Sequence, residues 1–326
     1  MQFEFLFIVV PFLVSVGSVA LVAKWNLKRG MTGVDVNKKD KRELPEGTGI
    51  ALLIPLWVSI IMFTTMVAEN SGFVAFGLTV SVLSIVGFLD DRKQKFKVRT
   101  VSWESRAAIV SLVCLMFAMF YAPQPLLLWL IPFAAFVAVL ASFQNTFAGL
   151  NGWEIGSGFI IALFVALLLL SEGPWPMAFA LVASIAGLLV FNVYPARVFP
   201  GDSGTLLIGG GIASLVILTQ RLELILLTSL FFLPHVVDFF FLKFLTNRAD
   251  MSQSKRLPYL LGQDGKLGVP VERGEKTKYD FAKLLLRLLG PMPEWAVVGL
   301  IWGIVSLNCI FWVFVFTQLG FCKPFF

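Results

Sequence analysis

Long apolar stretches separated by short polar gaps run from one end of this chain to the other. A bilayer core about 30 Å thick needs roughly 17–25 apolar residues per crossing helix. Hydrophobic residues make up 58% of the chain, against about 45–50% in a soluble domain. The pattern predicts a single all-α polytopic membrane domain over residues 1–326, with about ten transmembrane helices. The expected spans are about 3–24, 50–67, 72–89, 105–121, 125–143, 159–171, 177–191, 204–219, 222–243 and 293–317.

The positions of the basic residues predict the orientation of these spans. Every Lys and Arg except Arg221 and Lys323 falls in or beside the odd-numbered connections, counted from the N-terminus. Because cytoplasmic loops carry an excess of Lys and Arg, we expect the odd connections to face the cytoplasm and both termini to lie outside. The basic residues flank spans and do not alternate with exposed aromatic residues, so we expect no nucleic-acid partner. Basic loops at a membrane surface attract anionic lipid headgroups or a soluble polyanion.

The acidic and carboxamide side chains gather in the same odd connections. Asp90 and Asp91 end the third span, where two adjacent carboxylates indicate either a solvated helix end or a cation or proton-transfer site. Asn145 and Asn151, followed by Glu154, interrupt a very apolar stretch among several glycines. Carboxamide oxygens suit a hard cation, and a carboxamide also suits the edge of a nucleobase. A glycine-rich turn is the alternative interpretation.

Two further motifs each have a structural interpretation as well. Asp202, in Gly-Asp-Ser-Gly at the start of the eighth span, is placed either to cap that helix or to hold Mg²⁺ against a phosphate. Glu46 follows Pro45 at the start of the second span, after a basic loop with Asp35 and Lys38, and both ordinary capping and substrate contact are open. His235, within the ninth span, is expected to hydrogen-bond between helices.

The last cytoplasmic loop, residues 244–292, has signals for local structure of its own. The segment from Lys255 and Arg256 to the turn at Gln263–Gly265 suggests a small β-hairpin that could form a lid. The stretch 279–289 has the pattern of an amphipathic helix lying at the membrane surface.

Taken in order, these motifs resemble those of a known enzyme family. Pro-Glu-Gly, Asp-Asp, Asn-x5-Asn-Gly-x-Glu, Gly-Asp-x-Gly and a basic final loop are similar to the polyprenyl-phosphate N-acetylhexosamine-1-phosphate transferases, which form glycosyltransferase family 4. The resemblance covers nearly the whole chain and implies ten spans with both termini outside. Members transfer a sugar-1-phosphate from a UDP-amino sugar to dolichyl or polyprenyl phosphate and release UMP, with Mg²⁺ at the site and Mn²⁺ as an alternative ion. Homodimers occur in the family.

The resemblance also implies roles for individual residues. Asn145 and Asp202 correspond to metal ligands, and Asp90 and Asp91 to the catalytic acidic pair. Asn151 corresponds to a contact on the uracil side, and Glu46 to a contact with the nucleotide sugar. The family's basic residue beyond the acidic pair aligns with Thr100 here, so Lys97 or Arg99 is expected to take its place. The other expected substrate-binding residues are Lys38, Glu154, Lys255 and Arg256.

The histidine content indicates the branch. The muramoyl-pentapeptide branch carries a histidine-rich motif in its final loop, whereas His235 is the single histidine of this chain. The chain therefore resembles the branch that uses UDP-N-acetylglucosamine and dolichyl phosphate to begin N-glycan or surface-glycan assembly, archaeal enzymes included.

The resemblance implies in-line attack of the lipid phosphate on the β-phosphorus of the UDP-sugar, with Asp90 accepting a proton from that phosphate or orienting it. A covalent phospho-enzyme is the alternative route. A non-catalytic transporter or lipid flippase is the rival function, but transporters place charges near the middle of the membrane and show paired halves. A lipid phosphotransferase with a CDP-linked donor is disfavoured because its Asp-rich signature is missing.

Overall fold

The computed structural model of this chain describes residues 5–66, 71–96, 103–121, 126–244, 259–269 and 279–321, and they form an all-α membrane protein with two small hairpins. The expected positions Lys97, Arg99, Lys255 and Arg256 lie outside the described residues. The helices are α1 (Leu6–Lys28), α2 (Leu53–Met66), α3 (Ser71–Phe96), α4 (Trp103–Tyr121), α5 (Leu126–Thr146), α6 (Trp153–Leu168), α7 (Trp175–Asn192), α8 (Gly201–Ile217), α9 (Leu222–Phe231), α10 (Leu233–Val236), α11 (Phe281–Leu289) and α12 (Glu294–Gln318). A 3-10 helix η1 (Thr48–Leu52) precedes α2, and a π-helical segment η2 (Val237–Phe244) follows α10.

The helices fall where the apolar stretches predicted them. Within the described residues, six helical segments are long and apolar enough to cross a bilayer, and a bent pair, Leu222–Phe231 with Leu233–Phe244, would make a seventh. Three shorter apolar helical segments, Ala107–Tyr121, Trp153–Leu168 and Gly201–Ile217, complete the bundle. The number of ten spans and the orientation of the termini therefore remain predictions.

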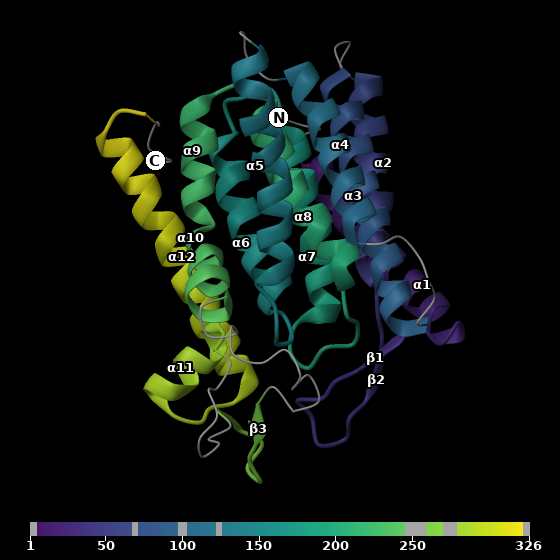
Figure 1. Cartoon of the computed structure of the whole chain (residues 1–326). Coiled ribbons are helices and arrows are strands. Elements are labelled where there is room, and N and C mark those ends of the chain that lie inside the picture. The colour runs from purple at the N-terminus through teal and green to yellow at the C-terminus, as the bar shows by residue number, and fades with distance from the viewer. Residues whose placement is uncertain are drawn as a thin grey trace.

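Helix α8 lies among the other helices of the bundle and packs against α3, α5, α6 and α7 (Figure 1). Nearly all of its residues are buried, including Gly209, Gly210 and Gly211. A Cβ atom on Gly209 would lie 2.3 Å from the carbonyl oxygen of Leu140 in α5, so the glycine allows the two helices to touch through their backbones. Such close approach is the usual role of small residues between membrane helices.

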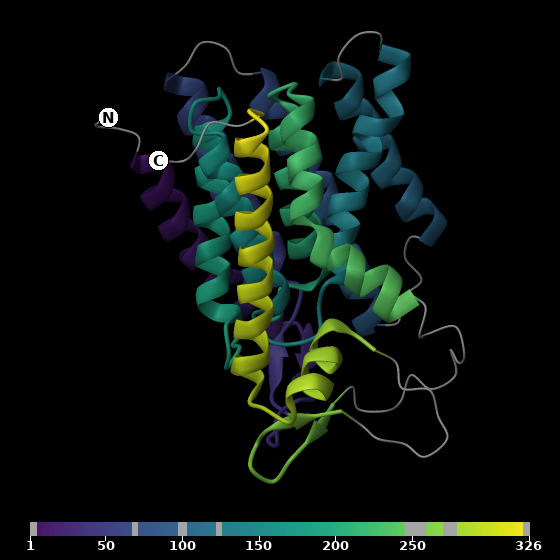
Figure 2. The same ribbon diagram turned by 90° about the vertical axis from the view of Figure 1, so that its left-hand side faces the viewer.

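Both hairpins lie at one end of the bundle. Strands β1 (Thr32–Val34) and β2 (Glu43–Pro45) pair antiparallel, as do β3 (Leu260–Leu261) and β4 (Leu267–Gly268). Figure 2 shows the hairpins and the amphipathic helix α11 at the lower end, and the start of α1 and the end of α12 towards the upper end. The loops that carry the candidate site are therefore remote from the two ends of the chain.

The ninth expected span, 222–243, is not a continuous helix. It bends by 52° between α9 and α10, beside Pro234, and continues as η2. A proline ring removes a backbone donor and clashes with the preceding turn, which explains the break. His235 lies just beyond it, stacked on Phe147 at 4.0 Å between ring centroids, and neither ring nitrogen has a hydrogen-bond partner in the part of the chain that the structure describes. The expected interhelical hydrogen bond of His235 was therefore wrong, and an aromatic cluster holds the ring in place.

Candidate active site

The N-terminus of α8 is the point where the acidic motifs meet. Asp91 Oδ1 accepts a 2.8 Å hydrogen bond from the backbone N–H of Asp202, and Asp91 Oδ2 accepts one of 3.4 Å from that of Ser203. A helix N-terminus favours a carboxylate because its first N–H groups have no partner within the helix. Asp91, which belongs to α3, thus caps α8 across the bundle.

This arrangement corrects two of the structural interpretations. The residue before α8 is Pro200 and the helix has no side-chain cap from its own segment, so Asp202 is not the capping residue. Helix α3 continues to Phe96, more than a turn beyond Asp90 and Asp91, so the pair is not a solvated helix end. Both carboxylates are buried.

Glycines make room for this contact. Gly201 has φ +69°, and a Cβ atom there would lie 2.3 Å from Asp91 Oδ2. A Cβ atom on Gly49 of η1 would lie 2.2 Å from the Cα atom of Gly204, and one on Gly87 of α3 would lie 2.5 Å from the carbonyl carbon of Asp202. Both glycines of the Gly-Asp-Ser-Gly motif are therefore required for steric reasons, because Asp91 and η1 both touch the first turn of α8.

Two more carboxylates, those of Glu154 and Glu46, interact electrostatically with Asp91 or Asp202. The charges of Asp202 and Asp91 act on Glu154, in the first turn of α6, and Lys243 is the cation that opposes them. Glu46 also acts on Asp91. Clustered carboxylates are costly unless a cation or a proton balances them, so the site is built to receive positive charge.

Glu46 lies between β2 and η1 and is not in a helical first turn, so the helix-capping interpretation was wrong. Burial raises the pKa of its carboxyl group above the usual 4.5, and the charge of Lys95 acts in the opposite direction. Glu46 is half-buried, and its backbone carbonyl accepts a 2.6 Å hydrogen bond from Asn26.

Asn145 completes an oxygen-rich group beside α8. Its Oδ1 atom accepts a 2.5 Å hydrogen bond from the hydroxyl of Thr205. Thr205 follows Asp202 by three residues, so both lie on one face of α8. Carboxylate and carboxamide oxygens are the ligands that Mg²⁺ prefers, and the chemistry of Asn145 and Asp202 fits that ion. Within the described residues, no three His, Cys, Asp or Glu side chains form a closed metal cage by themselves.

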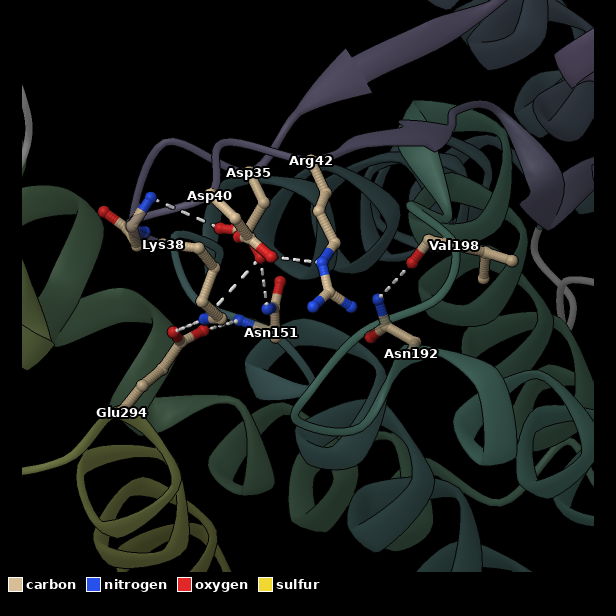
Figure 3. A network of polar contacts seen from close by, with 9 residues as sticks. Asp35, Lys38, Asp40, Arg42, Asn151, Asn192, Val198 and Glu294 are labelled. Atoms are coloured by element: carbon tan, nitrogen blue, oxygen red, sulfur yellow. Dashed lines mark hydrogen bonds and ion pairs between the residues drawn. The ribbon is translucent and has the colours of Figure 1, made fainter. Parts of the chain in front are cut away.

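A second network, shown in Figure 3, holds Asn151. Its Nδ2 atom donates to Asp35 Oδ2 at 2.8 Å, and its backbone N–H donates to Glu294 Oε1 at 2.8 Å. Lys38 pairs with Glu294 Oε2 and lies 3.6 Å from Asp35 Oδ2. The ring of Tyr194 lies 4.4 Å from the Lys38 ammonium group. The charge of Lys38 is therefore already compensated by two carboxylates.

Asp35 and Glu294 were not expected in the site. In the sequence, Asp35 is distinguished only as an acidic residue in a basic loop, which is weak evidence for a role in the site. Glu294 begins α12 after Pro293 and resembles an ordinary acidic residue in a helical first turn. Its partner Lys38 is more than 250 residues away in the chain, so a local pattern could not identify the pair.

Two cavities flank this network. One of about 210 Å³ lies between the β1–β2 loop and the start of α6, and a second of about 410 Å³ is lined by Lys38, Tyr194, Glu294 and the β3–β4 turn. Asn192 lines the smaller cavity, and its buried Oδ1 atom has no hydrogen-bond partner among the described residues. An aromatic ring among carboxamides suits a planar polar ligand. The polar and aromatic residues lining the smaller cavity include Asp35, Asn151, Glu154, Asn192 and Phe199.

Comparison with known proteins decides the family. The model of the family described as glycosyl transferase family 4 matches residues 73–220, from α3 to the end of α8. A putative glycosyltransferase of Methanocaldococcus jannaschii is 32% identical over 256 residues, which cover 76% of this chain and 78% of the relative. The chain belongs to glycosyl transferase family 4.

Other proteins similar to this chain carry more specific names. One from Sulfolobus acidocaldarius, 28% identical and covering 93% of both chains, is a putative UDP-N-acetylglucosamine–dolichyl-phosphate N-acetylglucosaminephosphotransferase. One from Carboxydothermus hydrogenoformans, 26% identical over 71% of this chain and 81% of its own, is a phospho-N-acetylmuramoyl-pentapeptide-transferase. The first of these agrees with the branch that the motifs indicated.

Proposed function

We propose that this family 4 protein transfers N-acetylglucosamine-1-phosphate, or a related N-acetylhexosamine-1-phosphate, from a UDP-sugar to dolichyl or polyprenyl phosphate, releasing UMP. The single observation that supports the proposal best is the contact of Asp91 with the backbone of Asp202 at the N-terminus of α8, where the charges of both residues also act on Glu154. The step would be the first membrane reaction of N-glycan or surface-glycan assembly, on the cytoplasmic face.

Asn145 and Asp202 would hold Mg²⁺, or Mn²⁺ as the alternative. Thr205 orients Asn145 by donating to its Oδ1 atom, which retains a second lone pair. When bound, the ion would neutralise charge on the transferring phosphoryl group and on departing UMP.

In the reaction, an oxygen of the lipid phosphate attacks the β-phosphorus of the UDP-sugar. The bond from that phosphorus to the bridging oxygen breaks, and UMP leaves with the oxygen. A phosphate monoester has a second pKa near about 6, so much of the acceptor is already deprotonated. Asp90 would accept the remaining proton or orient the acceptor. Asp91 acts as a positioning residue, since its carboxylate is occupied by the backbone of α8.

The donor would lie with its uracil in the smaller cavity, beside Asn151 and Phe199. Glu46 and Glu154 lie around the site, where we assign them contacts with the nucleotide sugar. Lys38 is assigned to the border of the two cavities. Lys97, Arg99, Lys255 and Arg256 are proposed to meet the diphosphate, and all four lie outside the described residues.

Detergent-purified protein given UDP-N-acetylglucosamine, polyprenyl phosphate and Mg²⁺ should release UMP. Omission of the lipid, addition of EDTA or the variant Asp202→Asn should each abolish the release. Well-folded protein that releases no UMP across a panel of UDP-sugars and lipid phosphates would contradict the proposal and favour a transporter.

A further inference from the structure

Asn151 is held by both its main chain and its side chain. Its backbone N–H is bound by Glu294 and its carboxamide nitrogen by Asp35, and all three residues are buried. Lys38 joins the two carboxylates, so the contacts close a ring through Asp35, Asn151, Glu294 and Lys38 (Figure 3). The members come from the β1–β2 loop, the loop before α6 and the first turn of α12.

The chemistry of this ring fixes which way the carboxamide faces. An ionised carboxylate accepts hydrogen bonds and cannot donate them, whereas a carboxamide has one donating and one accepting end. The nitrogen of Asn151 must therefore face Asp35, and a flipped carboxamide would place two acceptors against each other. In the fixed orientation, Oδ1 and the second N–H of Nδ2 form the edge of Asn151 that the bonds to Asp35 and Glu294 leave unused.

The acceptor and the donor on this edge of Asn151 are arranged so that they distinguish uracil from cytosine. Asn151 lines the smaller cavity together with Asp35 and Phe199. An acceptor beside a donor complements the ring N–H and adjacent carbonyl of uracil. It opposes cytosine, where the ring nitrogen is an acceptor and the adjacent exocyclic group is a donor.

We propose that Asp35 is a positioning residue that sets the preference of this site for a uracil nucleotide over a cytosine nucleotide, by fixing the orientation of Asn151. The inference rests on the proposed function, because it assumes that the base of a UDP-sugar occupies this cavity. Lys38 supports the arrangement, since its ammonium group keeps two buried carboxylates together beside Asn151.

The test is the equilibrium binding of UMP and of CMP to the purified protein in the presence of Mg²⁺. We expect the wild type to prefer UMP, and Asp35→Asn to reduce the ratio of the two affinities by about 10-fold or more, because a bidentate base contact contributes about 1–3 kcal/mol to discrimination. An asparagine at position 35 can pair with either orientation of Asn151. The matched control is Asp40→Asn in the same loop, whose exposed carboxylate pairs with Arg42, whereas the carboxamide of Asn151 donates to Asp35.

A folded Asp35→Asn protein that keeps the wild-type ratio would overturn the inference while leaving the proposed function intact. Wild-type protein that binds neither nucleotide would overturn both. If Asp35→Asn does not fold, UMP methylated at ring nitrogen N3 tests the same contact on the intact protein. It should bind about 10-fold or more weakly than UMP, and equal binding would contradict a fixed acceptor at this position.

Discussion

Asp91 and Asp202 are neighbours in space but contribute differently to the site. Asp91 offers its carboxylate to the backbone of α8, whereas Asp202 offers only its backbone N–H to that contact. The Asp202 carboxylate is therefore not needed for the cap. This difference separates the positioning role proposed for Asp91 from the metal-binding role proposed for Asp202.

The two Asp→Asn variants should accordingly behave differently in thermal unfolding. Both Asp91→Asn and Asp202→Asn are expected to abolish UMP release. Asp91→Asn should lower the melting temperature more than Asp202→Asn does, because an amide nitrogen would face one of the N–H donors of α8 and a charged-group hydrogen bond contributes about 1.5–3 kcal/mol. Equal melting temperatures for the two variants would contradict the assignment of Asp91 as the cap.

Glu46 predicts a pH dependence of stability. Its pKa is raised in the folded protein, so the folded state binds the proton more tightly than the unfolded state. The contribution to stability is complete below the usual pKa of 4.5 and is lost as pH rises through the raised value. Glu46→Gln should therefore gain in melting temperature over the wild type as the pH rises from about 4.5 to about 8, measured in EDTA. A difference that does not change with pH would contradict this.

At the scale of elements, the site depends on how closely η1, α3 and α8 approach. Gly49→Ala places a methyl group 2.2 Å from the Cα atom of Gly204, where the neighbour is backbone and cannot rotate away. We expect a loss of about 1–3 kcal/mol or more in stability, and loss of activity. Gly299→Ala on α12 is the control, because nothing lies within 4 Å of its added Cβ atom. A Gly49→Ala protein as stable as the control would contradict the packing account.

The helices could be predicted from the sequence, whereas the details of their ends and junctions could not. Spans could be placed because a bilayer demands about 20 apolar residues per helix, whatever the helix packs against. The bend beside Pro234 was not foreseen, although a proline is visible there, because a span can also continue through a kink. Asp202 was one candidate for the cap on α8, whereas the group that caps this helix comes from Asp91, far away in the chain.

For the whole molecule, the motif residues near α8 and Asn151 were foreseen, and the contacts between distant segments were not. Asn145, Asp202 and Asp91 stand in recognisable motifs, and the structure brings them to one helix end. Asp35 and Glu294 have no motif, since their importance arises only when the first loop meets α12. Long-range ion pairs of this kind need the folded chain.

The orientation of the whole protein in the membrane, with the candidate site on the cytoplasmic side, is also a prediction. In a Cys322→Ser background, Asp264→Cys on the exposed β3–β4 turn should react with an impermeant maleimide only after cells are permeabilised. Ser171→Cys, next to Glu172 at the end where Arg221 contacts Phe321, should react in intact cells. Cys114 and Cys309 are buried, so the background is low. The reverse labelling pattern would contradict a cytoplasmic site.

Transfer of the whole sugar-1-phosphate is tested most directly by the mass of the lipid product formed from UDP-N-acetylglucosamine and polyprenyl phosphate. Transfer of sugar-1-phosphate at the α8 site predicts a lipid with a diphosphate bridge and one UMP released for each molecule formed. A lipid with a single phosphate, accompanied by UDP, would show that the sugar alone is transferred. That result would contradict attack on the β-phosphorus and the mechanism assigned to this site.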